Sequence, residues 1–302
     1  MILIATSSEY PHPTPNLEAL VSALKAHGMD AAYLPWKTTP LETFAAAEAA
    51  LPLCCWDYYD DPGHFLAWID TLEARGARLL NPPELLRWNF RKTYLLEMAA
   101  AGLPVPRTIS LCDASPEAVA QAMEQEGWRT AVLKPVSSQN GHGIRKLGWA
   151  DRADWSFEAT PGDMLLQEFQ EDIGALGETT MTFIDGAFSH AVRRVMKAGE
   201  WRANPQYGIT YERVEVNRDV IDAARAFVDC LPQTPLYAHV DGLVRSRASD
   251  PKVEGTFGVN PMLDPSSNFM LMELELIDPY LYLEFASGSA DVMARAVVQR
   301  LG

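Results

Sequence analysis

The sequence predicts an α/β protein made of several compact lobes, and three observations favour this fold class. The chain has 302 residues, a length that suits one large domain or about two to three smaller lobes. In its first part, short apolar strands alternate with amphipathic helices, which is typical of a parallel sheet covered by helices. Its later part carries strands separated by tight turns, which favours lobes of the α+β type.

The composition excludes several classes of protein. Hydrophobic residues make up 48% of the chain and charged residues 22%, as in an ordinary soluble globular protein. The formal net charge of −15 argues against a nucleic-acid partner, because such a partner needs a basic surface. No apolar run is long enough to span a bilayer, so we expect no membrane partner and no signal peptide. Cys54, Cys55, Cys112 and Cys230 form no C-x-x-C pair, so we expect no zinc site and a cytoplasmic location.

The first lobe is expected over residues 1–88. Asn16 is the expected N-cap of its first helix, and Gly28 is the expected end of that helix. The strands are expected at 2–6, 31–36 and 51–56, and the helices at 16–28 and 62–76.

The remaining elements follow from apolar periodicity and turn residues. Residues 246–268, rich in Pro, Ser, Gly and Asp, predict a long mobile loop between two strands. A hairpin is expected at Asp185-Gly186. Helices are expected at 90–101, 115–127, 220–231 and 289–301, and strands at 130–136, 144–148, 163–169, 178–194 (the hairpin), 236–245 and 269–277.

A lysine before a small polar loop is the first candidate for chemistry. Lys134 ends an apolar strand and is followed by Pro135 and the segment SSQNGHG. A lysine at this place can reach a phosphate as a point charge. Backbone N–H groups around Ser138, Gly141 and Gly143 can form a concavity that binds an anion. The alternative is a surface lysine at a hairpin.

Two neighbouring strands carry carboxylates, and these predict a cation. Asp241 lies on one strand, and Glu273 and Glu275 point together from the next because alternate strand residues share a face. Three carboxylates make an oxygen cage that suits magnesium. On this interpretation Glu273 has no positive partner in the empty protein. The alternative is a set of salt bridges to arginines, for which the candidates are Arg193, Arg194, Arg202 and Arg245.

Two loops of the first lobe are candidates for the substrate site. The segments TSSEYPHPTPN and CCWDYYDDP fall at the carboxyl ends of expected parallel strands, where α/β sheets bind ligands. The alternative for each aromatic residue is simple packing within its loop. The candidate substrate contacts are Tyr10, His12, Trp56, Asp57 and Tyr58.

The order of these motifs resembles the ATP-grasp superfamily, and more narrowly the branch with bacterial glutathione synthetase and small amino-acid ligases. The ordered set comprises Lys92 ahead of AAAGLPVPRT, Lys134-Pro135 with its loop, QEF at 167–169, Arg202, Asp241 and ELE at 273–275. The resemblance covers nearly the whole chain. It implies three lobes, at 1–88, 89–165 and 166–302, with ATP and magnesium held between the second and the third.

The resemblance also implies a role for each matching residue. The expected phosphate contacts are Lys92, Lys134, Ser138, Gly141 and Gly143; Glu168 would meet the adenine, and Glu178, with Glu171 as its competitor, the ribose. Asp241 and Glu273 would bind magnesium, with Glu275 in a position where many relatives carry asparagine. Arg202, helped by Arg193 and Asn204, would steady the acyl-phosphate region. His239 departs from the pattern, because this branch has an arginine beside the aspartate.

The function that this resemblance implies is an ATP-dependent ligase for a small amino acid. Members activate a carboxylate as an acyl phosphate, which an amine then attacks. The branch contains dipeptide-forming ligases and the cyclising ligase that makes the antibiotic cycloserine, so ligation between two molecules and within one both stay open. The alternatives are an enzyme that modifies a peptide or protein, and a catalytically silent nucleotide-binding module. A homodimer is possible.

Overall fold

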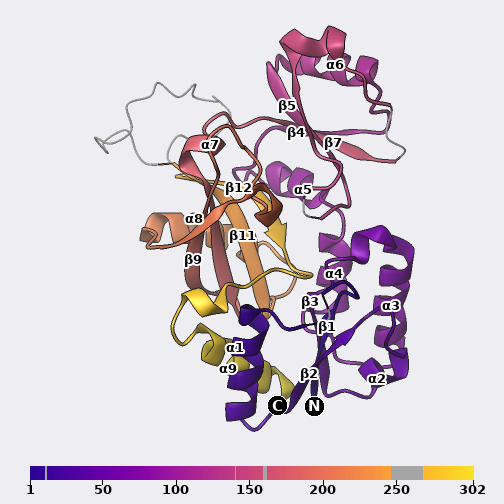
Figure 1. The fold of residues 1–302 in the computed structure, drawn as a ribbon, viewed down its shortest axis with the longest axis vertical. Helices are drawn as coiled ribbons and strands as arrows, with labels where there is room; N and C mark the ends of the chain where they lie inside the picture. The colour runs from indigo at the N-terminus through magenta and orange to yellow at the C-terminus, as the bar shows by residue number, and fades with distance from the viewer. Residues whose placement is uncertain (11, 140, 159–161, 246–267) are drawn as a thin grey trace.

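The computed structural model describes residues 1–10, 12–139, 141–158, 162–245 and 268–302. The expected loop at 246–268 therefore lies outside the described residues, apart from Asn268. Three sheets stand one above another along the long axis of the molecule (Figure 1). In the part of the chain that the structure describes, no helix has the length and apolarity to cross a membrane.

The first sheet is parallel, as predicted. Its strand order is β2-β1-β3, and its helices are α1, α2 and α3. The N-cap of α1 is Thr14, whose side chain accepts a hydrogen bond from the Leu17 N–H, so the prediction of Asn16 as the cap was wrong. Asn16 is instead buried, and its side-chain oxygen accepts from the Leu283 N–H at 3.2 Å. The elements are β1 (Ile2–Thr6), α1 (Pro15–Ala26), β2 (Ala31–Pro35), α2 (Leu41–Ala45), β3 (Ala49–Cys54) and α3 (Pro62–Ala74).

The second sheet is antiparallel, with the order β4-β7-β5-β6. Ser115 caps α6 as predicted, since its hydroxyl accepts from the Ala118 N–H at 3.3 Å. The helix expected at 90–101 is shorter than predicted: it begins at Tyr94, and Lys92 lies in the turn before it. The elements are α4 (Pro83–Asn89), α5 (Tyr94–Ala100), β4 (Thr108–Leu111), α6 (Pro116–Glu126), β5 (Thr130–Pro135), β6 (Arg145–Gly148) and β7 (Met164–Glu168).

The third sheet is also antiparallel and has the order β10-β9-β8-β11-β12. Its hairpin turns at Asp185 and Gly186, both with positive φ, as a tight type I′ turn requires. The elements are α7 (Ile173–Leu176), β8 (Glu178–Ile184), β9 (Ala187–Val195), β10 (Thr210–Val214), α8 (Arg218–Asp229), β11 (Tyr237–Val244), β12 (Phe269–Glu275) and α9 (Ser289–Leu301). Single 3-10 turns lie at Tyr58–Asp60, Trp149–Asp154, Pro205–Tyr207 and Leu283–Phe285.

Helix α9 returns to the first sheet, where it packs beside α1 (Figure 1). Met293 and Val297 of α9 share one buried cluster with Ile4 and Leu17 of the first lobe. The first and third lobes are thus joined by a common core. The lobe boundaries at 88 and 165 stay a prediction, and β7, which spans the second boundary, pairs within the middle sheet.

Strand β12 forms an edge of the third sheet, and side chains complete its backbone hydrogen bonds. The Asn89 amide donates to the Leu274 carbonyl at 2.7 Å and accepts from the Leu276 N–H at 2.7 Å. The Leu274 N–H donates to the hydroxyl of Tyr94 at 3.0 Å, and Asn81 donates to the Leu276 carbonyl at 2.8 Å. Because buried backbone groups require partners, these three side chains fix the position of β12.

The pairing of β11 with β12 contains an irregularity that shapes the site. Asp241 lies opposite Glu273, but the next residue, Gly242, lies opposite Leu271. Met272 is therefore the extra residue of a β-bulge. It turns toward the same side as Glu273, and both side chains line the cavity described below.

Gly242→Ala should destabilise the protein. A methyl group at this position would overlap the Phe269 ring and the Met270 carbonyl oxygen. Such overpacking typically costs about 1–3 kcal/mol. Gly63→Ala in α3 is the matched control, because a methyl group there meets nothing within 4 Å. Urea unfolding of the two variants checks this, and equal free energies of unfolding would show that the bulge adapts to a side chain.

Candidate active site

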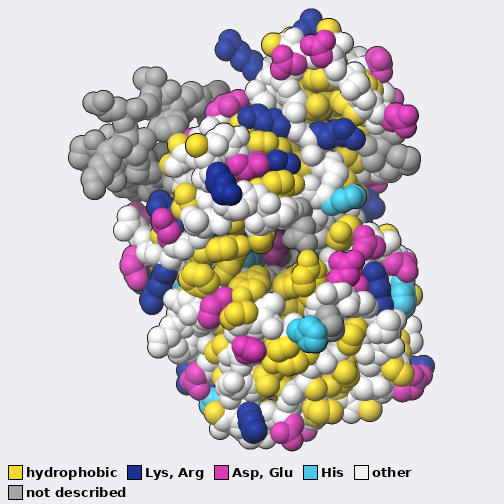
Figure 2. Space-filling view, viewed as in Figure 1, with side chains coloured by type: hydrophobic (Ala, Val, Ile, Leu, Met, Phe, Trp, Pro, Cys, Tyr) yellow, Lys and Arg dark blue, Asp and Glu magenta, His cyan; other side chains and the backbone are white. Residues whose placement is uncertain are grey.

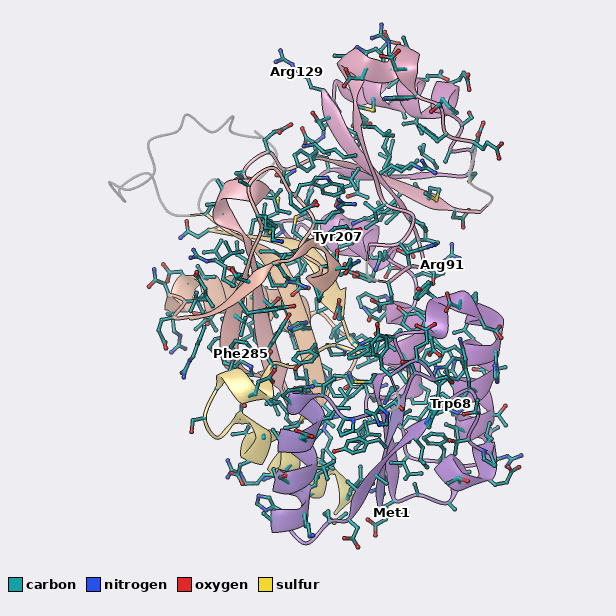
Figure 3. The ribbon with its side chains drawn as sticks, in the orientation of Figure 1. Met1, Trp68, Arg91, Arg129, Tyr207 and Phe285 are labelled. Atoms are coloured by element: carbon teal, nitrogen blue, oxygen red, sulfur yellow. The ribbon has the colours of Figure 1, made fainter. Side chains whose placement is uncertain are left out.

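One cavity, of about 930 Å³, lies where the three lobes meet. Its walls come from the first-lobe loops, from β5 and β7 of the middle sheet, and from β8, β9, β11 and β12. Figure 2 shows a recess between the upper and lower parts of the molecule, bordered by hydrophobic and acidic side chains. Tyr207 lies at this junction (Figure 3).

Most of the predicted site residues line this cavity. They are Tyr10, Trp56, Asp57, Lys92, Lys134, Ser138, Gly141, Glu168, Glu178, Arg202, Asn204, Asp241, Glu273 and Glu275. Residues separated by up to most of the chain length thus meet in one place. Their assigned roles stay predictions.

Five predicted residues lie outside this lining. Arg193 pairs with Glu212 at 2.7 Å, and Tyr58 is buried in the first lobe. His12 and Glu171 are exposed. Gly143 has a φ of 74° and packs against the Pro135 ring, so it shapes the loop through its backbone. The ring of Tyr58 packs within the first lobe, as the alternative interpretation expected: it stacks on Phe65 with ring centroids 4.9 Å apart.

Cationic side chains pair with two carboxylates of β11 and β12. Glu273 forms an ion pair with Lys92, and Asp241 forms one with Arg194 at 2.5 Å. Arg194 also reaches Glu178 at 3.3 Å. The expectation that Glu273 has no positive partner in the empty protein was therefore wrong. Its partner is a lysine, whereas Asp241 has one of the arginines of the alternative interpretation.

Burial is the largest single influence on the pKa of Asp241, Lys92 and Glu178 in this cluster, but at the first two the neighbouring charges and hydrogen bonds together outweigh it. Burial alone would raise the pKa of Asp241, but the positive charge of Arg194 holds this pKa below its usual value. Burial likewise opposes the charge of Lys92, but Glu273 raises the pKa of that lysine. At Glu178 burial dominates and raises the pKa of the carboxyl group. Lys92 and Asp241 are thus held in their charged forms.

Lys134 differs from Lys92 because it has no carboxylate partner among the described residues. Its ammonium donates to the side-chain oxygen of Gln167 at 3.1 Å, and Gln167 donates in turn to Thr108 at 2.8 Å. Burial lowers the pKa of Lys134 to about 8. A buried ammonium that faces a cavity without a counter-ion is well suited to an anionic ligand.

Several other polar atoms along the cavity lack a hydrogen-bond partner within the described ranges. They include the Ser138 hydroxyl, both ring nitrogens of His239 and one carboxylate oxygen of Asp278. Buried polar groups are usually hydrogen-bonded in native proteins. These groups therefore make the cavity suited to a polar ligand.

The donor set on β11 and β12 has the chemistry that magnesium prefers. Asp241, Glu273 and Glu275 offer only carboxylate oxygens. Within the described part of the chain, no three or more His, Cys, Asp or Glu side chains are grouped closely enough to hold an ion. The set fits magnesium only if the ion pairs with Lys92 and Arg194 rearrange.

An apolar slot lies between the middle and third sheets. Glu168 stands at its edge, at the end of β7. Its walls are formed by Val132, Ile144, Phe169, Trp201 and Met272. An apolar wall with a few polar groups at its rim is typical of a small-molecule site.

Sequence reasoning assigned no ligand role to four residues that line or support the cavity. Arg194, Gln139 and Asp278 line it, and Gln167 holds Lys134. Arg194 could have been found from the register of the β8–β9 hairpin, because it lies directly opposite Glu178 and residues in such cross-strand pairs interact. No local pattern identifies Gln139 or Gln167.

Two family models match the chain. The first, described as D-cycloserine synthetase DcsG, N-terminal domain, matches residues 2–81. The second, described as prokaryotic glutathione synthetase, ATP-grasp domain, matches residues 98–239. The cycloserine biosynthesis protein DcsG of Streptomyces lavendulae is 26% identical over 295 residues, which cover 95% of this chain and 94% of that protein. The glutathione synthetase of Synechococcus elongatus is 29% identical over 153 residues, 49% of this chain and 45% of that protein.

Solved structures share the fold. The crystal structure of D-cycloserine synthetase DcsG superposes with a TM-score of 0.79 at 22% identity and covers 100% of both chains. The ATP-grasp ligase PsnB, complexed with a precursor variant, Mg and ADP, gives 0.61 at 17% identity, over 100% of this chain and 98% of that one. The D-alanine–D-alanine ligase of Bacillus anthracis complexed with ATP gives 0.62 at 13% identity, over 99% and 96%. Residues 98–239 thus match an ATP-grasp domain of the glutathione-synthetase type, and the whole chain shares the fold of ATP-grasp ligases.

Glu273→Gln should destabilise the protein without any ligand, because it leaves the buried Lys92 without its negative partner. Breaking a buried pair costs about 3–5 kcal/mol, and partial exposure of Glu273 reduces this to roughly 1–3 kcal/mol. Glu275→Gln is the matched control, since no lysine or arginine pairs with Glu275 among the described residues. Denaturant unfolding measures both. A Glu273→Gln protein as stable as the parent would contradict this prediction, because it would mean that the Lys92 ammonium is solvated in solution and does not need Glu273.

Lys134 should make stability rise with pH. Its folded pKa of about 8 lies below the ordinary 10.5, so between these values the unfolded chain binds the extra proton. Stability therefore increases across this window, by at most about 3 kcal/mol. Lys134→Met should remove this increase. The check is the difference between parent and variant in free energy of unfolding from pH 7.5 to 10.5; parallel curves would contradict the assignment.

Proposed function

We propose that this ligase activates the carboxylate of one small amino acid and closes that same molecule into a ring. The observation that carries the proposal is the single cavity, which joins Lys134 and the apolar slot to Tyr10, Trp56 and Asp57 of the first lobe. Its volume lies within the range of small-ligand sites. With a nucleotide bound, it leaves room for a small second molecule. The similarity of residues 2–81 to the N-terminal domain of D-cycloserine synthetase DcsG supports ring closure.

The nucleotide would lie between the middle and third sheets. Its base would enter the apolar slot, where Glu168 at the edge can meet the adenine. Lys134, Ser138 and Gly141 would contact the phosphates. Glu178 would approach the ribose, which requires the carboxyl group to exchange Arg194 for a sugar hydroxyl.

Magnesium would be held by Asp241, Glu273 and Glu275, and it would neutralise the charge of the phosphate oxygens. Without magnesium, Glu273 forms an ion pair with Lys92. When the nucleotide enters, Lys92 can turn to a phosphate while Glu273 becomes available to the metal. Lys92 and Glu273 would thus each exchange one oppositely charged partner for another, and neither would be left unpaired.

The reaction requires two successive displacements. An oxygen of the substrate carboxylate attacks the terminal phosphorus of ATP, and the bond from that phosphorus to ADP breaks. The side-chain amine then attacks the carbonyl carbon of the acyl phosphate. The carbon–oxygen bond breaks, phosphate leaves with its electron pair, and the amine loses a proton.

Arg202 and Asn204 are proposed to steady the acyl phosphate. Arg202 lines the cavity, pairs with Glu200 at 2.8 Å and lies 3.6 Å above the Tyr207 ring. Glu200 and Tyr207 hold the guanidinium in place before the negative charge of the phosphate develops. Such preorganisation lowers the energy of the charged transition state. The proposal also places the enzyme in the cytoplasm, where ATP is available.

Phosphate release from ATP tests the proposal. The substrates are single amino acids with a side-chain nucleophile, namely O-aminoserine, diaminobutyrate and ornithine in both enantiomers, beside alanine and serine alone and in pairs. We expect release with one of the first group alone, and a product lighter than its substrate by one water. Release only with pairs of amino acids would identify a dipeptide ligase. Release with none would exclude both.

A further inference from the structure

Asp278 follows β12 and lines the cavity at the place where it meets the first lobe. The residue is 2% exposed. One carboxylate oxygen accepts a hydrogen bond from the side-chain amide of Gln139 at 2.9 Å, and the same amide donates to the Tyr58 hydroxyl at 3.1 Å. The backbone carbonyl of Asp278 accepts from the Trp56 indole at 3.0 Å. Gln139 thus holds the carboxylate, and Trp56 holds the backbone of the same residue.

Its second oxygen lacks the kind of partner that three other carboxylates of the lining have. That oxygen is buried and has no hydrogen-bond partner among the described residues. Asp241 pairs with Arg194, Glu273 with Lys92, and Asp57 with Lys37 at 3.3 Å. No cationic side chain of the described ranges forms such a pair with Asp278. Burial, followed by the negative charge of Glu275, accordingly raises the pKa of Asp278 well above its usual value.

We propose that Asp278 binds the α-ammonium group of the amino-acid substrate, an inference that rests on the proposed function. An ammonium group supplies both the missing donor and the missing positive charge. The neighbouring rings of Trp56 and Tyr10, which meet edge to face with centroids 5.6 Å apart, add an electron-rich wall for a cation.

The surroundings favour a monovalent ammonium over a metal ion. Magnesium needs several oxygen ligands in a regular arrangement. Here the nearest polar group, the Gln139 amide, presents its N–H groups to the carboxylate. One free oxygen beside N–H donors and aromatic rings can accept a hydrogen bond but cannot surround a divalent ion.

The position of Gln139 also shows that the proposed ammonium site lies next to the loop proposed to hold the phosphates. Gln139 adjoins Ser138, which lines the cavity beside the proposed phosphates. In an α-amino acid a single carbon separates the ammonium from the carboxylate. An ammonium anchored at Asp278 therefore brings the carboxylate close to the loop where the phosphoryl group would arrive, and Asp278 becomes the residue that selects α-amino acids.

Calorimetric titration with ADP and magnesium present, so that no turnover occurs, tests the proposal. The probes are O-aminoserine and aminooxypropionate, its analogue without the α-ammonium. In the parent we expect the ammonium to improve affinity roughly 10- to 100-fold, as for a hydrogen bond to a charged group. Asp278→Asn retains the acceptor for Gln139, and it should bind both probes with nearly the same affinity. Asp60→Asn, an exposed carboxylate of the same lining, is the control that should keep the parental discrimination.

The outcomes separate this inference from the proposed function. A parent that does not prefer O-aminoserine, or an Asp278→Asn protein that keeps the parental preference, would overturn the role of Asp278 even if ring closure occurs. Discrimination that depends on Asp278 would support that role even if phosphate release identifies a ligase joining two molecules. Matching melting temperatures for parent and variant would exclude a loss of binding through unfolding.

Discussion

The position of β12 is the constraint on which the rest of the structure depends. This strand has a neighbour on one side only, and the backbone groups on its other side are satisfied by Asn89, Tyr94 and Asn81. These side chains come from the segment that connects the first lobe to the second. A sheet edge that would otherwise be open to another strand is thereby closed, and the carboxylates of β12 are held at the junction of all three lobes.

Positive and negative side chains are balanced in the site, where burial limits contact with water. Asp241 on β11 and Glu273 on β12 each have a cation beside them, and these cations are suited to hold phosphates. Lys134 and Asp278 have no such partner among the described residues: the Lys134 ammonium donates to an amide oxygen, and one side-chain oxygen of Asp278 has no hydrogen-bond partner. Most charged groups of the site are thus already paired, and a bound ligand would exchange partners with them. Binding then costs less than the creation of new buried charges.

The sequence predicted most of the longer helices and strands, because their signals are local, but it missed the short elements α2, α4, β4, α7 and β10. The parallel first sheet, the Asp185-Gly186 hairpin and the shared face of Glu273 and Glu275 all follow from periodicity and turn chemistry. The partner of Glu273 could not be found in this way, since Lys92 lies far away in the sequence. Lys92 itself was expected within a helix, but its N–H donates to the Val136 carbonyl at 2.7 Å, a contact between segments. Contacts of this kind depend on how lobes dock, which no local pattern records.

The shared core of α9 with the first lobe has a consequence for how the protein folds during synthesis. Ile4 and Leu17 leave the ribosome before Met293 and Val297, which lie more than 270 residues further along the chain. Until then the first lobe carries an uncovered apolar face. The middle lobe has a buried cluster made only of its own residues, such as Val119 and Leu133, and can fold in the meantime. Long-range closure is slow and leaves such faces open to aggregation, so we expect the first lobe to be prone to aggregation until α9 packs against it.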